Sequence, residues 1–192
     1  WGRWDIAWRL PLALAVLLVL GSVACADRPA AVDNSTLQYF PPIGGPQDMG
    51  DCTCWSSAYY YCTYTQARDH GQNAATADPN VLCSRRFLFA LIAEGAYGAE
   101  CTERAMEHLS EVGCATIAQH PISTWYTEWP SETAWVTALR NRLGTLHKIR
   151  VDNESGLETV KQHIADGGVA VTRALFHVNY PGYGDTATGS GI

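Results

Sequence analysis

Apolar residues recur at the spacing of an α-helix in several segments, and glycines or polar caps bound them. The predicted helices span residues 52–68, 84–93, 102–113, 131–143 and 155–167. In the third of these helices Ala105, Met106 and Leu109 share one face. Each predicted helix therefore has an apolar side that must pack against another element.

The helix ends carry residues with known capping preferences. Thr102 stands where an N-cap is expected, and Gly144 follows the fourth helix as a C-cap. Ser155 and Glu158 have the spacing of a capping box, which predicts the start of the fifth helix.

Two later segments predict strands rather than helices. Residues 146–151 form a short apolar run, and residues 169–178 partly alternate between apolar and polar positions. Because the helices come first and the strands follow, the order predicts an α+β fold.

The N-terminal residues have the pattern of an export signal. Basic residues flank the start, residues 10–20 form an apolar run, and residues 24–26 fit a small-x-small cleavage site. The apolar run is too short for a comfortable membrane span. We therefore predict a signal peptide over 1–26, a polar linker over 27–38, and a secreted or periplasmic protein without membrane contact after cleavage.

The composition excludes some partners. The net charge is −6 and no basic stripe is present, so nucleic acid is not expected as a partner. Cys52 and Cys54 are separated by one residue rather than two, and no second pair follows them. This spacing does not fit a zinc ribbon, and neither a metal nor another cofactor is predicted.

Seven cysteines are present, and an exported chain meets an oxidising compartment in which some of them should pair. Cys101 and Cys114 bracket the third helix and could close a loop, although spacing alone does not give connectivity. Cys25 could carry a lipid, but Ser22 stands where that motif has leucine, so no lipid anchor is predicted.

The most informative stretch is residues 50–60, Gly-Asp-Cys-Thr-Cys-Trp-Ser-Ser-Ala-Tyr-Tyr. A glycine turn brings Cys52 to the start of the first predicted helix. The amide groups and partial positive charge of a helix N-terminus stabilise a thiolate, which is the nucleophilic form of cysteine. This arrangement indicates covalent catalysis by a cysteine.

Several segments, taken in one order, are similar to those of the papain-like cysteine peptidases, especially the bacterial secreted members. Residues 39–44 resemble the segment that leads to the active-site loop, and residues 50–56 resemble the nucleophile signature. Residues 82–88 resemble a leucine-serine-x-x-phenylalanine-leucine segment of that family. The resemblance continues through residues 102–122 and 157–171, so it covers about residues 39 to 178.

The resemblance implies a helical lobe over residues 39–145 and the beginning of a β-rich lobe over 146–192. It implies peptide hydrolysis through a thiol acyl-enzyme, with peptide or protein substrates and no cofactor. In that family the catalytic histidine follows a glycine in the β-rich lobe, and an asparagine orients it. We expect both beyond residue 192; His177 is the alternative base within the chain.

Two alignments compete for the nucleophile. Trp55 lies three residues after Cys52, as the family signature requires, whereas Cys54-Trp55 matches the familiar cysteine-tryptophan pair. We favour Cys52 and keep Cys54 as the alternative. Residues two apart on a helix do not share a face, so one of these thiols should be buried or paired.

The oxyanion hole departs from the family pattern. The family has a glutamine six residues before the nucleophile, but Pro46 stands there and Gln47 follows it. Gln47 would serve only if the loop is one residue shorter. Asp51 places a negative charge beside the thiol, which disfavours a thiolate. Two alternatives to the secreted peptidase therefore remain, a non-catalytic binding protein of the same fold and a thiol transferase or amidase.

Overall fold

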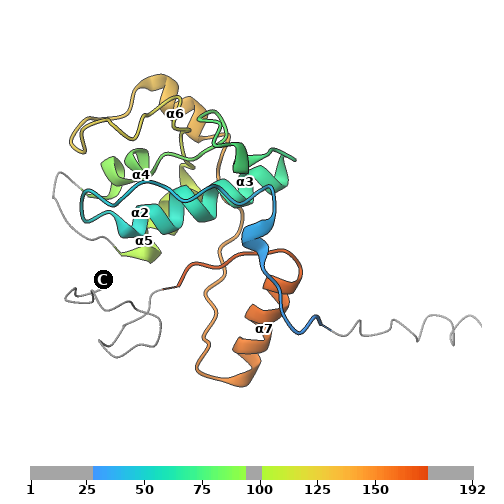
Figure 1. Ribbon diagram of the computed structural model, residues 1–192. Coiled ribbons are helices and arrows are strands. Elements are labelled where there is room, and N and C mark those ends of the chain that lie inside the picture. The colour runs from blue at the N-terminus through green and yellow to red at the C-terminus, as the bar shows by residue number, and fades with distance from the viewer. Residues whose placement is uncertain (1–27, 94–100, 173–192) are drawn as a thin grey trace, which may run out of the picture. The chain divides into compact units, whose positions relative to one another are not determined.

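One long helix organises the part of the chain that the structure describes, residues 28–93 and 101–172. In this computed structural model α2 (Cys52–Cys54), the π-helical η2 (Trp55–Cys62) and α3 (Thr63–Asp69) follow one another without a break (Figure 1). The helix predicted over residues 52–68 is confirmed. π-helical turns are rare and are frequent at functional sites.

Shorter helices surround this long one. They are η1 (Asn34–Thr36), η3 (Ala74–Thr76), α4 (Arg85–Ile92), α5 (Thr102–Glu111), α6 (Glu132–Ala138) and α7 (Glu154–Ala165). Both α4 and α5 contact α2 and η2, and they also contact each other. Contacts divide the chain into Trp1–Ala30 and Ala31–Ile192, and all of these helices belong to the second unit. The predicted signal peptide lies outside the described residues, and the predicted boundary after residue 145 stays a prediction.

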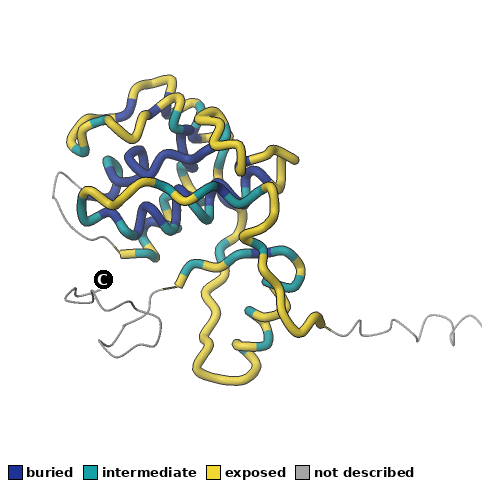
Figure 2. The backbone as a smooth tube through the Cα atoms, viewed as in Figure 1, coloured by how far each residue is buried: buried dark blue, intermediate teal, exposed yellow. Residues whose placement is uncertain are grey.

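The long helix divides its side chains between two hydrophobic cores. Cys54, Ala58 and Cys62 are spaced four residues apart and face one core, while Trp55 and Tyr59 face the other. The first core is completed by buried side chains of α4, α5 and α6, namely Phe87, Leu88, Phe89, Ile92, Ala105, Leu109, Ala134 and Ala138. Figure 2 shows the buried residues concentrated along the long helix and its neighbours. The helix is thus held on two sides.

Some helix ends differ from the predicted ones. The N-cap of α5 is Cys101 rather than Thr102, and the N-cap of α7 is Asn153, whose side chain accepts from the Gly156 amide, rather than Ser155. The helix predicted over 131–143 ends at Ala138. A turn follows it, in which the Asn141 side chain donates to the Cys114 carbonyl at 3.0 Å, and this long-range contact replaces further helical turns.

The predicted α+β fold with the start of a β-rich lobe over 146–192 is wrong for the residues described. They contain no strand or sheet, only an isolated antiparallel bridge between Cys83 and Thr116. Residues 146–151 are extended but are not hydrogen-bonded into a ladder, and residues 169–172 are likewise not a strand. A strand exists only where a neighbour satisfies its backbone groups, and local pattern does not reveal that neighbour. The rest of the strand predicted to residue 178 lies outside the described residues.

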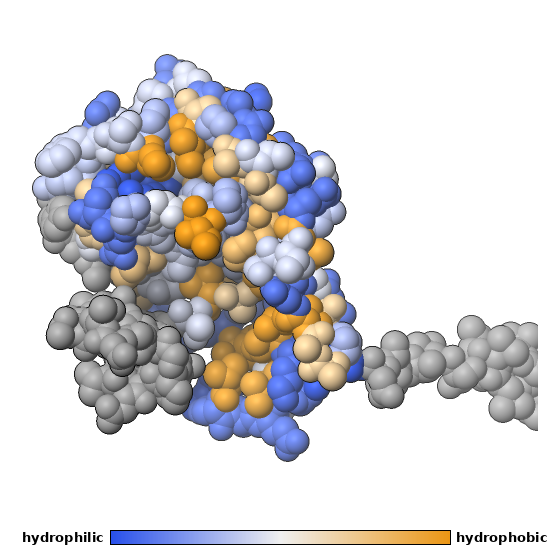
Figure 3. Space-filling view, viewed as in Figure 1, coloured by the Kyte–Doolittle hydropathy of each residue, from blue (hydrophilic) through white to orange (hydrophobic). Residues whose placement is uncertain are grey.

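The last described helix, α7, has no buried residue. Its C-terminal end is tied to the rest of its unit by hydrogen bonds to backbone carbonyls: Asn34 donates to Ile164 and Gly168 at 2.8 Å, and Tyr64 donates to Gly167 at 2.6 Å. Figure 3 shows hydrophobic surface over α7 and around η1. None of the described helices is long and apolar enough to cross a membrane.

The loop before α2 is fastened to the long helix by aromatic side chains. The Tyr59 hydroxyl donates to the Pro42 carbonyl at 3.1 Å, and the Gly44 amide donates to the Tyr60 hydroxyl at 3.2 Å. Gly44 also lies against the Trp55 ring, where a side chain has no room. These contacts set the path of the chain toward Cys52.

Replacing Gly44 with alanine should destabilise the protein, because the new Cβ would lie 2.1 Å from an atom of the Trp55 ring. That ring is buried and packs edge-on against Tyr59, so it cannot move aside freely. We expect the free energy of unfolding, measured by urea titration, to fall by about 1–3 kcal/mol. Gly45→Ala is the matched control, since nothing lies within 4 Å of its Cβ. Equal losses in the two variants would contradict the packing argument.

Candidate active site

Cys52 is the first residue of α2 and is partly exposed. The preceding residue, Asp51, occupies the N-cap position, but its side chain makes no capping hydrogen bond. Its carbonyl accepts from the Trp55 amide at 3.0 Å, so the helix begins directly at the cysteine. A thiol in this place lies at the N-terminus of a helix, whose free backbone amides carry partial positive charge.

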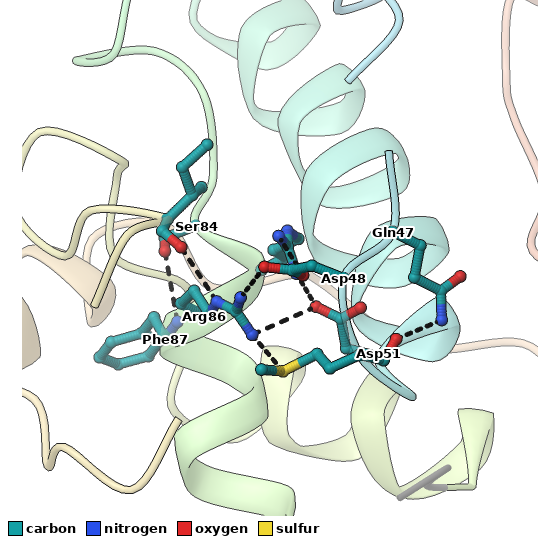
Figure 4. A network of polar contacts seen from close by, with 9 residues as sticks. Gln47, Asp48, Asp51, Ser84, Arg86 and Phe87 are labelled. Carbon is teal, nitrogen blue, oxygen red and sulfur yellow. Dashed lines mark hydrogen bonds and ion pairs between the residues drawn. The ribbon is translucent and has the colours of Figure 1, made fainter. Parts of the chain in front are cut away.

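The Asp51 side chain is buried and faces two guanidinium groups. It is ion-paired with Arg85, and Arg86 Nη1 lies 3.8 Å from the same carboxylate oxygen. Figure 4 shows the Asp48 and Asp51 carboxylates together beside Arg86. The negative charge of Asp51, which is next to Cys52 in the sequence, is therefore compensated by arginines far along the chain.

A second carboxylate, Asp48, bridges the same two arginines. It accepts from Arg85 Nη2 at 2.9 Å and from Arg86 Nη2 at 2.5 Å. Although burial acts in the opposite direction, these guanidiniums hold the pKa of Asp48 below its usual value of 3.8. We call Asp48, Asp51, Arg85 and Arg86 the Arg–Asp cluster.

The first turn of α4 holds both arginines. Ser84 caps that helix by accepting from the Phe87 amide, and its own amide donates to the Ala115 carbonyl at 2.8 Å. A positive charge at a helix N-terminus is unfavourable to the helix dipole, so the two arginines need nearby acids. Asp48 and Asp51 supply them from the loop before α2. The cluster thus joins the start of α4 to the start of α2.

The packing around Arg85 makes the cluster rigid but not fully hydrogen-bonded. The Arg85 guanidinium lies over the Trp55 ring, 4.4 Å from its centroid, in a cation–π contact. Among the described residues, Asp51 Oδ1 and Arg85 Nε are buried without a hydrogen-bond partner. A buried charged group that lacks some of its hydrogen bonds lowers the stability of the fold. Such a group calls for an explanation other than stability.

The structure separates the two candidate nucleophiles. Cys54 is 0% exposed and belongs to the first hydrophobic core, whereas Cys52 keeps access to solvent. The other predicted site residue, Gln47, is exposed, and its side-chain amide donates to the Met49 carbonyl on its own loop. The Gln47 side-chain amide is therefore already hydrogen-bonded to the backbone of its own loop.

The described histidines occupy other environments. His120 is buried, packs edge-on against Phe87, and has its pKa lowered by that burial. His70 contacts Gln66 at 3.2 Å, and His163 contacts the Val169 carbonyl at 3.0 Å. Within residues 28–93 and 101–172, no hydrogen bond joins a histidine to Cys52. His177 lies outside the described residues.

A pocket of about 240 Å³ lies against the Arg–Asp cluster. Its walls come from the loop before α2, the first turn of α4 and the turn after His120. The lining residues are Asp48, Met49, Arg86, Ile122, Ser123, Thr124 and Trp125. The Arg86 Nε donates to the Ile122 carbonyl at 3.0 Å and so ties the two walls together. No group of three or more histidine, cysteine or acidic side chains in the described ranges is arranged to hold a metal ion.

Sequence reasoning missed Arg85 and Arg86 as residues of this site. The signal was available, because two adjacent arginines in the first turn of a predicted helix stand at the unfavourable end of its dipole. Such a pair requires acids nearby in space. The sequence could not show which acids, since Asp51 and Arg85 are 34 residues apart.

Breaking the buried ion pair should lower the free energy of unfolding, and a second substitution should restore part of the loss. Arg85→Met leaves the Asp51 carboxylate buried with only the more distant Arg86, and we expect a loss of about 3–5 kcal/mol in unfolding free energy. Adding Asp51→Asn removes the uncompensated charge and should restore part of that loss. Arg140→Met, at an exposed position, is the control. Additive losses in the double variant, measured by urea titration, would refute the pairing.

The lowered pKa of Asp48 predicts a pH effect on stability. The stabilisation is complete above the unfolded-state pKa, about 3.9, and is lost as the pH falls through the lower folded-state value. Between pH 6 and pH 2.5 wild-type protein should therefore lose more stability than Asp48→Asn. Asp69→Asn, which removes a surface carboxylate 3.8 Å from Arg68, serves as the control. An identical acid loss in wild type and Asp48→Asn, followed by urea unfolding, would contradict the assignment.

Comparisons with known proteins agree with this geometry at the level of the fold. No protein-family model matches the sequence, and a search of curated proteins gives no match. Among solved structures, the chain is similar to xylellain, a cysteine protease from Xylella fastidiosa, with a TM-score of 0.56 and 16% sequence identity. The alignment covers 74% of this chain and 55% of the xylellain chain, so this chain spans about half of that length. The likeness supports a papain-like fold, as the sequence motifs predicted.

Proposed function

We propose that the chain carries the nucleophile of an exported, papain-like cysteine peptidase, and that Cys52 is this nucleophile. The observation that carries the proposal is the difference between the two thiols at the helix start. Cys52 opens α2 and reaches solvent, whereas Cys54 is enclosed in the core. The likeness to a cysteine protease supports the same chemistry.

The surroundings of Cys52 are compatible with a nucleophilic role. The sequence suggested that Asp51 would oppose it, but this carboxylate is paired with Arg85 and turned away into the interior. Its negative charge is therefore largely neutralised where the thiol stands. Cys52 itself stands at the N-terminus of the helix, where the backbone amides carry partial positive charge.

In the proposed reaction the Cys52 thiolate attacks the carbonyl carbon of a peptide bond. The resulting oxyanion accepts a hydrogen bond from the Cys52 backbone amide, and collapse releases the amine and leaves a thioester. Water then attacks the thioester and regenerates the thiol. A side-chain donor to the oxyanion would have to come from Gln47, after its amide leaves the Met49 carbonyl.

The reaction also needs a base that activates the thiol and protonates the leaving amine. We place this imidazole, and the residue that orients it, in the protein beyond Ile192, with His177 as the alternative. The 55% coverage of the xylellain chain is consistent with such an addition. The predicted signal peptide over residues 1–26 supports export, and the substrates are peptides or proteins.

A second candidate function is a papain-fold protein that binds without catalysis. The position of Gln47 favours it, because the amide that would serve the oxyanion is occupied by a backbone carbonyl. Losing one oxyanion donor costs about 100- to 1,000-fold in turnover in other acyl-transfer enzymes. A thiol transferase would instead pass the acyl group to an added amine, which product analysis detects, whereas an amidase would pass it to water from an amide other than a peptide bond.

In the complete protein, Cys52→Ala should abolish hydrolysis of a labelled protein substrate, with a loss of at least about 1,000-fold in kcat/KM, because it removes the sulfur that forms the thioester. Cys54→Ala is the matched control and should retain most of the activity, since its side chain only packs in the core. Circular dichroism would verify that both variants fold.

The proposal fails if Cys54→Ala is inactive while Cys52→Ala still cleaves. If the complete, folded wild-type protein cleaves nothing and binds peptides, the second candidate function is the correct one.

A further inference from the structure

Three cysteines from distant parts of the sequence meet inside the first hydrophobic core. Cys62 ends η2, Cys83 stands just before α4, and Cys114 follows α5. All of them are fully or almost fully buried, and the sulfur atoms of Cys62 and Cys83 are 3.5 Å apart. The Cys114 thiol belongs to the same core and donates to the Ser84 carbonyl at 3.4 Å.

This arrangement differs from the pairing considered on sequence grounds. Cys101 is exposed and its sulfur contacts Glu103 at 3.6 Å, while Cys114 is buried beside Cys62 and Cys83. A bond between Cys101 and Cys114 would have to pull one of them out of its environment. The buried cluster therefore offers nearer partners than the loop-closing pair.

Three thiols gathered in one buried place can react with one another. Cys62 and Cys83 are the pair in direct contact, because the Cys83 thiol donates to the Cys62 sulfur at 3.5 Å. Burial raises the pKa of Cys114, which keeps that thiol protonated. The Cys62 and Cys83 sulfur atoms, 3.5 Å apart, are within about 1.5 Å of the length of a disulfide bond, which is about 2 Å.

We propose that Cys62 and Cys83 form a disulfide in the mature protein and that Cys114 remains a thiol beside it. The bond would close a loop between positions 21 residues apart. It rests on the proposed export, which brings the chain to an oxidising compartment, and not on the proposed peptidase activity. Two of the three clustered thiols are thereby used, and Cys114 is the one that stays reduced.

The oxidant is a disulfide donor, either oxidised glutathione or an exported thiol-disulfide oxidoreductase. The Cys83 thiolate attacks one sulfur of the donor, which releases one donor thiolate and leaves a mixed disulfide. The Cys62 thiolate then attacks the Cys83 sulfur and releases the second donor thiolate. The two donor thiolates take up the two protons lost by Cys62 and Cys83. Because the cysteines are buried in the folded chain, these steps occur during folding.

The bond would join the same two elements as the Arg–Asp cluster. Cys62 belongs to the long helix that Cys52 opens, and Cys83 directly precedes Ser84, the N-cap of α4. A hydrogen bond already joins the two elements here, because the Cys83 backbone amide donates to the Thr63 hydroxyl at 2.8 Å. The disulfide would therefore fix the start of α4, where Arg85 and Arg86 stand.

The test is a peptide map of the full chain made in an oxidising compartment, alkylated and digested without reductant. The tryptic peptide that ends at Arg68 should be joined to the one that ends at Arg85. Chymotryptic cleavage after Tyr61 and Tyr64 separates Cys62 from Cys52 and Cys54 and identifies the bonded sulfur without any variant. Unjoined peptides, or a bond to Cys114 or Cys101 in their place, would overturn the proposal.

A thermal measurement gives a second readout. Reducing the wild-type chain should lower Tm by roughly 10 °C, the shift expected for opening a loop of this length. Cys101→Ala is the control and should show the same response to reductant, whereas the Tm of Cys62→Ala should no longer respond. A wild-type Tm that reductant does not change contradicts the bond.

Discussion

The buried pair of Arg85 and Asp51 is the contact on which the candidate site depends. It joins the first turn of α4 to the residue that precedes Cys52, and Asp48 and Arg86 extend it into the Arg–Asp cluster. Two helix N-termini carry partial positive charge and would repel each other at close range. Asp51 between them converts that repulsion into an attraction and leaves the Cys52 end of α2 without a competing charge.

The position of Trp55 shows how this contact couples to the fold. One face of its ring receives the Arg85 guanidinium, and Gly44 of the loop before α2 lies against the ring as well. Its neighbour four residues along, Tyr59, holds the same loop through the Pro42 carbonyl. The loop, the nucleophile helix and α4 are therefore set by one group of contacts. A residue at the start of α2 is positioned from both sides.

Local pattern predicted the helices well because their signals are short-range. The Ser84 and Ser131 caps and the apolar face of the helix that starts at Thr102 all depend on residues within a few positions. The strands were wrong for the opposite reason. Residues 146–151 have a strand-like composition, but a strand needs a partner, and the described residues offer none.

The candidate site was predicted in part for the same reason. That Cys52 and Cys54 must face different ways followed from helical spacing, and the burial of Cys54 agrees with it. The neutralisation of Asp51 by Arg85, and the meeting of Cys62, Cys83 and Cys114, depend on pairs separated by tens of residues. No spacing rule along the chain reveals such contacts, because they exist only once the helices have packed.

The most direct test of the central claim compares two thiols in one chain. The folded chain is treated with limiting iodoacetamide near pH 6, and mass spectrometry gives the modification rates of Cys52 and of the exposed Cys101. If the Arg–Asp cluster leaves the helix end free to stabilise a thiolate, Cys52 should react at least about tenfold faster, and the two rates should converge in denaturant. A Cys52 that reacts no faster than Cys101 in the folded chain would contradict the account.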